Sequence, residues 1–183
     1  MLINALPPVI KSDSVLLRQW SSDDFKFYSS FFASDSNARF YGGAVDPQKA
    51  WRHLASVIGH WTLRQFGVYA VESVGCDGLQ GCVGLWEPHG WPCREFAYWF
   101  VPSAYDSGRA LRAAELALAQ VKESFPRQAI KGFIHPDNAS ALSLAHEMGA
   151  TLRAEVPLFD FGPHVQVSFF NPRALASSEV SRC

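Results

Sequence analysis

The sequence predicts an α+β fold, a mixed α/β arrangement built on one mostly antiparallel, twisted sheet. Segments 67–74 and 79–87 are strand-like and flank a short glycine-rich turn, which predicts a β-hairpin. A third strand-like segment at 94–101 extends this hairpin into a meander. The second half then alternates strand, helix and strand, which is typical of a βαβ unit. We expect about six or seven strands and about four flanking helices.

Length and composition favour one globular domain over residues 1–183. Hydrophobic residues make up 48% of the chain and charged residues 18%, so the chain is too apolar to be disordered. We expect loose ends at 1–14 and 173–183. The formal net charge of -1 argues against nucleic acid as a partner.

The four cysteines are scattered, at Cys76, Cys82, Cys93 and Cys183. They form no C-x-x-C pair, and no histidine cluster has metal-ligand spacing, so we expect no metal site. This scatter is typical of reduced thiols and predicts a cytoplasmic protein. The N-terminal segment lacks a basic start followed by a long apolar run, so we expect neither a signal peptide nor a membrane partner.

The first half is expected to begin with a strand at 15–20. Ser21 and the acidic residues after it then cap a helix that reaches about Phe32. A second helix begins at Asp46-Pro47, with proline in its first position and apolar residues at helical spacing after it.

The second half is expected to contain an alanine-faced helix after Gly108, which Pro126 ends. Asn138 caps another helix that runs to about Met148, and Gly149 stops it. Three further strands are expected at 129–134, 151–156 and 165–170.

The turn Asp106-Ser107-Gly108 directly precedes the alanine-faced helix. The first turn of a helix exposes unpaired N–H groups and the positive end of the helix dipole, so it binds anions such as phosphate. Gly108 and Ala110 leave this backbone approachable, Ser107 offers a hydroxyl donor and Arg109 a cation. Asp106 opposes this hypothesis, because it could cap the helix instead. An ordinary strand-to-helix turn remains the alternative.

Several motifs together resemble the GNAT superfamily of acyl-CoA-dependent N-acyltransferases, in particular the ribosomal-protein N-terminal acetyltransferase (RimJ/RimL) branch. They are REFAYWFV, AYDSGRA, HPDNASALSLAHEMGA, GLWEPHGWP and the early Leu17-Arg18-Gln19-Trp20. The resemblance covers about residues 15–156. It implies a GNAT-like sheet with a splayed strand pair at the cofactor site.

The pyrophosphate loop of the superfamily, Q/R-x-x-G-x-G/A, falls on residues 105–110. Gly108 and Ala110 match it, while Tyr105 replaces the usual Gln or Arg. The later motif N-x-x-A-x-x-L-Y-x-x-x-G-F matches at four positions, but Ala145 replaces the tyrosine that often serves as general acid and Ala150 replaces the phenylalanine. The four matches are Asn138, Ala141, Leu144 and Gly149.

The resemblance implies acetyl-CoA as co-substrate and no metal. The residues expected to hold the diphosphate are Tyr105, Ser107, Gly108, Arg109 and Ala110. Asn138 and Ser140 are expected to contact the pantetheine arm. A backbone N–H at Phe100 or Val101 is expected to stabilise the oxyanion.

Direct transfer requires a neutral amine, so a general base is useful. Glu95 is our first candidate, because it opens the strand that should carry the oxyanion donor. Glu87 and His89 are second candidates, and His135 is the third. Each of these side chains is also compatible with a merely solvated position at the end of a strand.

The resulting prediction is an N-acetyltransferase that acts on a small-molecule or peptide amine, with a homodimer possible. A catalytically degraded acyl-CoA-binding or interaction module of the same fold is the alternative, motivated by Tyr105, Asp106 and Ala145. A flavodoxin-like nucleotide binder is a weaker third reading, because that fold needs successive parallel βαβ units and residues 67–87 read as a hairpin.

Overall fold

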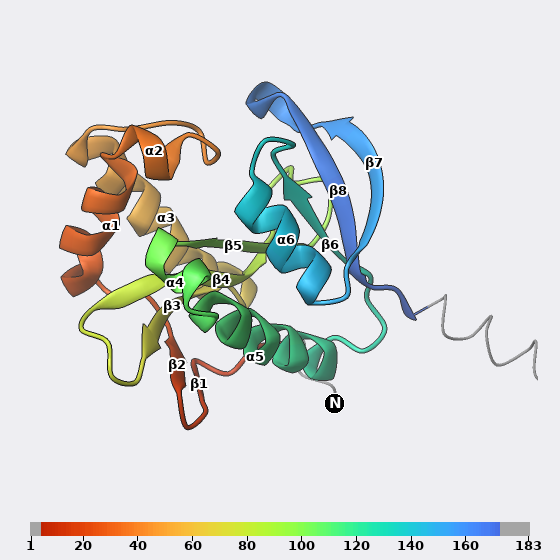
Figure 1. Cartoon of the computed structure of the whole chain (residues 1–183), viewed down its shortest axis with the longest axis horizontal. Coiled ribbons are helices and arrows are strands. Elements are labelled where there is room, and N and C mark those ends of the chain that lie inside the picture. The colour runs from red at the N-terminus through yellow and green to blue at the C-terminus, as the bar shows by residue number, and fades with distance from the viewer. Residues whose placement is uncertain (1–4, 173–183) are drawn as a thin grey trace, which may run out of the picture.

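The computed structural model describes residues 5–172, and within them a single sheet holds eight strands. The strand order is β1-β2-β3-β4-β5-β6-β8-β7, as Figure 1 shows. The β5–β6 pair is parallel and every other neighbouring pair is antiparallel. The predicted α+β class with a mostly antiparallel sheet is confirmed, with eight strands instead of six or seven.

The strands are bounded as follows: β1 (Val9–Lys11), β2 (Val15–Arg18), β3 (Val68–Ser73), β4 (Leu79–Trp86), β5 (Glu95–Phe100), β6 (Ile130–Ile134), β7 (Thr151–Pro157) and β8 (Pro163–Phe170). The helices are α1 (Phe25–Phe32), α2 (Asp35–Ala38), α3 (Pro47–Arg64), α4 (Pro102–Asp106), α5 (Arg109–Ser124) and α6 (Ala139–Glu147). Two short 3-10 turns, η1 (Ser22–Asp24) and η2 (Phe159–Phe161), complete the described chain.

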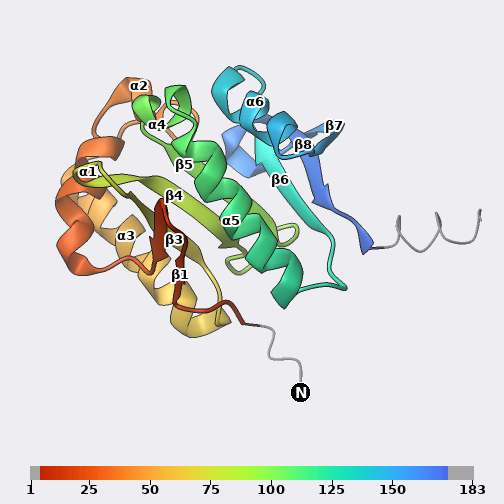
Figure 2. The ribbon, with the colours of Figure 1, turned by 60° about the horizontal axis from the view of Figure 1, so that its bottom comes forward.

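Helices cover both faces of the sheet, and Figure 2 shows α5 lying across one of them. The alanine-rich face of α5 is buried there as predicted, because small side chains let the helix approach the strands closely. α1 and α3 cover the opposite face with a largely aromatic cluster. Strand alternation divides β5 between the two layers: Tyr98 and Phe100 join the α5 side, and Trp99 joins the α1 side.

Three elements differ from the sequence-based expectation. Residues 9–11, expected within a loose end, form the edge strand β1, which pairs with β2 through Val9 opposite Arg18. A three-residue strand leaves too short a pattern to be recognised without its partner. The short helices α2 and α4 were not predicted, and α4 lies between the strand expected at 94–101 and the turn at 106–108. The expected loose end at 173–183 lies outside the described residues.

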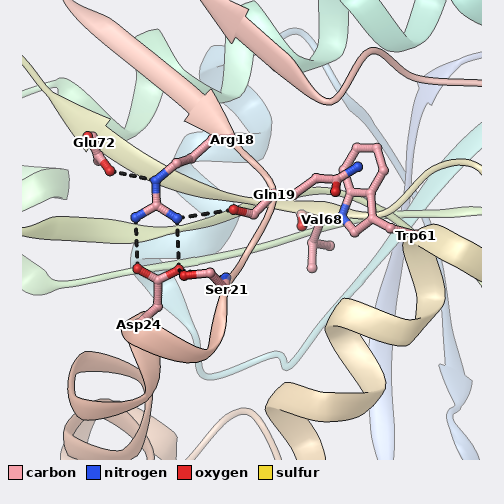
Figure 3. Close-up of polar contacts among 7 residues, drawn as sticks. All are labelled: Arg18, Gln19, Ser21, Asp24, Trp61, Val68 and Glu72. Carbon is pink, nitrogen blue, oxygen red and sulfur yellow. Dashed lines mark hydrogen bonds and ion pairs between the residues drawn. The ribbon is translucent and has the colours of Figure 1, made fainter.

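The Leu17-Arg18-Gln19-Trp20 motif joins the start of α1 to the sheet (Figure 3). The Arg18 guanidinium lies 2.7 Å from a carboxylate oxygen of Asp24 and 2.7 Å from one of Glu72. Burial alone would raise the pKa of Asp24, but hydrogen bonds from Arg18 and Ser21 outweigh it and hold that pKa below its usual value. The motif therefore fixes where α1 leaves the sheet.

The two apolar residues of this motif, Leu17 and Trp20, pack on opposite faces of the sheet. Leu17 is fully buried in the α5-side core, whereas Trp20 packs on the α1 side, 5.8 Å from the ring of Trp99. The same Figure 3 shows Trp61 of α3, whose indole N–H donates to the Val68 carbonyl at 3.1 Å.

The sheet opens between its two parallel strands. β5 and β6 are paired at one position only, Glu95 opposite Lys131, and they diverge beyond it (Figure 1). The predicted splayed strand pair is therefore present, and the gap widens toward Phe100 and Ile134. Both candidate ligand regions described below lie along this gap.

Candidate active site

The turn before α5 has the backbone geometry of an anion-binding elbow. Gly108 is the N-cap of α5 with φ +69°, a conformation that favours glycine. No side chain caps the helix, and Asp106 is exposed. The expected competition from Asp106 is therefore absent, and the first-turn N–H groups of α5 face outward without a capping side chain.

Two groups of the elbow are already engaged within the protein. The Gly108 N–H donates to the Tyr105 carbonyl at 3.1 Å, and the Ser107 hydroxyl donates to the Ser103 carbonyl at 2.7 Å. The Ser107 hydroxyl, a predicted anion donor, is therefore engaged at the end of α4 in this structure. The donors that remain at the elbow are the first backbone N–H groups of α5, from Arg109 and Ala110 onward.

Two arginines supply positive charge at the elbow. Arg109 is held by hydrogen bonds from its Nε to Gln80 at 3.2 Å and from its Nη2 to the Ser103 carbonyl at 3.2 Å. Arg112, one turn into α5, reaches back and donates from its Nη2 to the Ser107 carbonyl at 3.4 Å. Its Nη1 would lie 3.8 Å from a Cβ added to Gly108. Arg112 therefore places a second cation beside Gly108 at the elbow.

The hydrogen bonds of β5 distinguish the two residues, Phe100 and Val101, whose N–H was expected to stabilise the oxyanion. The Val101 N–H donates to the Gln80 carbonyl at 2.9 Å, so it already has a partner within the sheet. Because successive residues of a strand point their N–H groups to opposite sides, those of Tyr98 and Phe100 point toward the β6 side. Phe100 is thus the residue of the predicted pair that faces the gap.

A cavity of about 170 Å³ lies between the elbow and the start of α6. Tyr105, Asn138 and Ser140, all predicted cofactor-binding residues, line it. Asn138 is buried and caps α6, accepting from the Ala141 N–H at 3.2 Å. Its amide nitrogen also donates to the Tyr41 hydroxyl at 3.3 Å, which ties α6 to the loop between α2 and α3.

A second cavity, of about 180 Å³, lies on the α1 side of the gap and has Glu95 in its wall. The Glu95 side chain is buried, and its Oε2 accepts a hydrogen bond from the Trp91 indole N–H at 2.8 Å. Burial raises the pKa of Glu95 to about 7, although hydrogen bonds from Trp91 and the Phe133 backbone lower it. This carboxylate therefore changes charge near neutral pH.

The other predicted acid–base residues are separated from one another. His135 lines the same cavity as Glu95, with its ring 5.1 Å from that of Phe40. Glu87 lies 3.0 Å from the Arg94 guanidinium and so has a partner of its own, and His89 is exposed on the loop after β4. The structure thus brings Glu95 and His135 together and leaves Glu87 and His89 outside the cavity wall.

Several cavity residues were not singled out from the sequence. Tyr41 lines both cavities, and Phe161 and the buried His164 line the larger one. They lie on the loop between α2 and α3 and on the β7–β8 hairpin, far in sequence from every motif. The sequence carried no signal for them beyond their aromatic character.

The tryptophans divide between core and cavity. Trp86 and Trp91 line the larger cavity, and the Trp86 ring stacks on His60 at 4.7 Å. Trp61 is a core residue, and Trp51 is half exposed on α3.

Residues 5–172 contain neither a metal-binding cluster nor a membrane-spanning helix. No group of three or more His, Cys, Asp and Glu side chains in this range is placed to hold a metal ion. No helix in the same range is long and apolar enough to cross a membrane.

Residues 14–151 match the family model described as an Acetyltransferase (GNAT) domain. Because this match covers well over half of the chain, the chain belongs to the GNAT acetyltransferase family. The resemblance drawn from the sequence motifs is thereby confirmed at the level of the superfamily.

Solved structures share the fold at low sequence identity. An acetyltransferase from Agrobacterium tumefaciens str. C58 has a TM-score of 0.80 at 19% identity, over 90% of this chain and 95% of that one. A putative ribosomal-protein-serine acetyltransferase from Vibrio cholerae has a TM-score of 0.72 at 16% identity, over 90% and 97%. Mycobacterium smegmatis RimJ, in complex with CoA-disulfide, has a TM-score of 0.66 at 14% identity, over 89% and 85%. Proteins of the RimJ/RimL type are thus among the structural neighbours.

Proposed function

We propose that the chain is an acetyl-CoA-dependent N-acetyltransferase that transfers the acetyl group directly to a primary amine. The observation that carries this proposal is the arrangement of the two cavities along the β5–β6 gap. They share the wall residues Phe40, Tyr41 and Asn138; one cavity leads to the elbow and the other contains Glu95. An acyl carrier with a diphosphate at one end and a reacting thioester at the other matches this layout.

The elbow residues fit the diphosphate of CoA. The first-turn N–H groups of α5 bind it, and Arg109 and Arg112 add positive charge. Asn138 and Ser140 line the path of the pantetheine arm, and the Phe100 N–H faces the gap where the acetyl carbonyl must lie. Bound acetyl-CoA supplies an activated acyl group as a thioester.

Glu95 acts as the general base in this proposal. It removes a proton from the acceptor ammonium, directly or through water, and so produces the neutral amine that attacks. Its pKa of about 7 suits this role, because the carboxylate is then both present at neutral pH and basic enough to take a proton. The imidazole rings of His135 and His164 lie in the same cavity wall.

The position of the usual tyrosine acid carries no hydroxyl here. Ala145 is buried on α6, so no side chain there protonates the departing thiolate. Thiols have pKa values near about 8.5, so a thiolate leaves or takes a proton from water without a dedicated acid. The Tyr41 hydroxyl belongs to a residue in the wall shared by both cavities and is a candidate donor for that proton.

Calorimetric titration with CoA and acetyl-CoA tests the cofactor half of this proposal, and mass spectrometry of acetyl-CoA reactions with an amine panel tests the chemical half. We expect binding of both ligands and an acetylated amine product. Binding without any product over the panel would instead identify the non-catalytic acyl-CoA-binding module. Absence of binding would overturn the proposed function.

A further inference from the structure

The larger cavity has an unusual chemical character for a site that must hold an ammonium group. About half of the described residues that line it are Phe, Tyr or Trp, and none of them is Lys or Arg. Glu95 is the one carboxylate among them. Its two hydrogen-bond donors, the Trp91 indole and the Phe133 backbone, hold it in place and leave its charge as the anionic feature of the wall.

The single carboxylate of the wall, that of Glu95, can pair with one ammonium group of an acceptor. A second ammonium group, as in a polyamine or a lysine side chain, would enter an aromatic wall with no anionic partner. Burying an unpaired charge costs several kcal/mol, so such an acceptor would be strongly disfavoured. Aromatic faces, by contrast, gain free energy by covering an apolar or aromatic body.

The mouth of the cavity is narrowed by the β7–β8 hairpin. Phe161 of η2 reaches across to the loop between α2 and α3, where its Cε1 would lie 3.4 Å from a Cβ added to Gly42. Beside it, the ring of Phe159 packs 5.3 Å from Trp91. A peptide chain leaving the cavity would have to pass these rings, and its backbone amides would find few polar partners there.

We propose that the acceptor is a small primary monoamine with an apolar, preferably aromatic, body and no second charge. This inference rests on the proposed function and names the substrate class of the same site. The amine nitrogen lies against Glu95, and the apolar body occupies the aromatic cavity under Phe161. Glu95 accepts one proton from the ammonium group, and the neutral nitrogen forms the new amide bond as the thioester C–S bond breaks. CoA leaves as a thiolate, which takes up the second proton that the nitrogen loses, directly or through water.

The experiment compares three acceptors with acetyl-CoA: 2-phenylethylamine, spermidine and a short peptide with a free N-terminus. We expect kcat/KM for 2-phenylethylamine to exceed the other two by more than about tenfold. Trp86 and Trp91 lie in the cavity wall, so 2-phenylethylamine should also change the tryptophan fluorescence of the CoA-loaded protein without turnover.

A charge variant sharpens this test. Phe161→Glu places a second carboxylate at the mouth, at a side chain that is 49% exposed and so tolerates the change. We expect it to raise kcat/KM for 1,4-diaminobutane by about tenfold over the unmodified chain. Leu152→Glu is the matched control, because it introduces the same charge at an exposed position on β7. Leu152 lies outside the cavity wall, so this variant should give no such gain.

Three outcomes would overturn the substrate class while leaving the proposed function intact. They are equal or better acetylation of spermidine or the peptide, a CoA-loaded protein that neither binds nor acetylates 2-phenylethylamine, and preferred use of octanoyl-CoA, which would assign the cavity to the acyl chain. CoA binding, measured without any amine, separates these failures from failure of the proposed function. If CoA does not bind, both proposals fall.

Discussion

The elbow and the larger cavity differ in how far apart their residues lie in the sequence. The elbow is nearly continuous in sequence, from Pro102 to Arg112, and its donors are backbone groups at the surface. The cavity takes its wall from both halves of the chain, and about half of its lining residues are aromatic. A local motif therefore describes the elbow, whereas the cavity exists only once α1, α3, β5, β6 and the β7–β8 hairpin have packed together.

This difference is consistent with the two regions binding different ligands. In the proposed function, the elbow recognises a feature common to all CoA thioesters, so its geometry depends on helix termini and glycine. The larger cavity would then recognise the acceptor, and its chemistry depends on which side chains the fold brings together. Substitutions in the two regions should accordingly separate effects on CoA affinity from effects on the acceptor and on the chemical step.

The largest expected effect is on the cavity side. Glu95→Gln keeps the hydrogen bond from Trp91 but removes the base, so kcat should fall by about 10²–10⁴-fold. CoA affinity, measured by calorimetry, should stay within about twofold. Glu87→Gln is the comparison, because Glu87 is paired with Arg94 away from the cavity. An equal loss in Glu87→Gln would show that the base has been misassigned.

The pH dependence of the same variant gives a second test. Activity of the unmodified chain should rise with pH through about 7, as Glu95 loses its proton, and Glu95→Gln should lack this step. For stability the sign is opposite: the folded pKa of Glu95 lies above the unfolded one of 4.5, so its contribution is fully present below pH 4.5 and declines as pH rises through about 7. Denaturant titrations at pH 8 should find Glu95→Gln more stable than the unmodified chain, by up to about 3 kcal/mol.

On the elbow side, the main test is Gly108→Val. The side chain must adopt φ +69° at the point where the diphosphate approaches, so CoA affinity should fall by about tenfold or more, with a stability cost of about 1–2 kcal/mol. Gly149→Val is the matched control, because Gly149 has φ +76° in open space beyond α6. Similar stability loss with unchanged CoA affinity in the control would separate strain from ligand contact. Equal CoA loss in both variants would contradict the assignment of the elbow.

A smaller effect is expected from Trp91→Phe, which keeps an aromatic ring but loses the N–H donor. The hydrogen bond from Trp91 lowers the pKa of Glu95, so its loss should move the activity step to a higher pH than in the unmodified chain. The measurement is the pH profile of kcat/KM. A step that stays in place or moves to lower pH would argue against Glu95 as the titrating base.

The smallest effect should come from Arg112→Gln. Arg112 is exposed, so its attraction for the diphosphate is weakened by solvent and CoA affinity should fall only about two- to fivefold. The loss should shrink as salt concentration rises. Lys122→Gln, in the last turn of the same helix, is the control and should leave CoA affinity unchanged. A loss that does not depend on salt would indicate a structural role for Arg112.

The sequence by itself determined those features that depend on residues close together along the chain. Helix and strand periodicity identified the meander and the buried alanine face of α5, and strand alternation separated Trp99 from Tyr98. The glycine elbow was also readable, because its φ requirement and exposed N–H groups are properties of a few consecutive residues.

Only the tertiary structure decided which polar groups remain available for function. The Val101 N–H proved to be taken by Gln80, the Ser107 hydroxyl by α4 and the Glu87 carboxylate by Arg94, while Glu95 was left in the cavity wall. The reason is physical: hydrogen bonding and burial are settled by partners that are distant in sequence, and the pKa of a carboxylate follows from that burial.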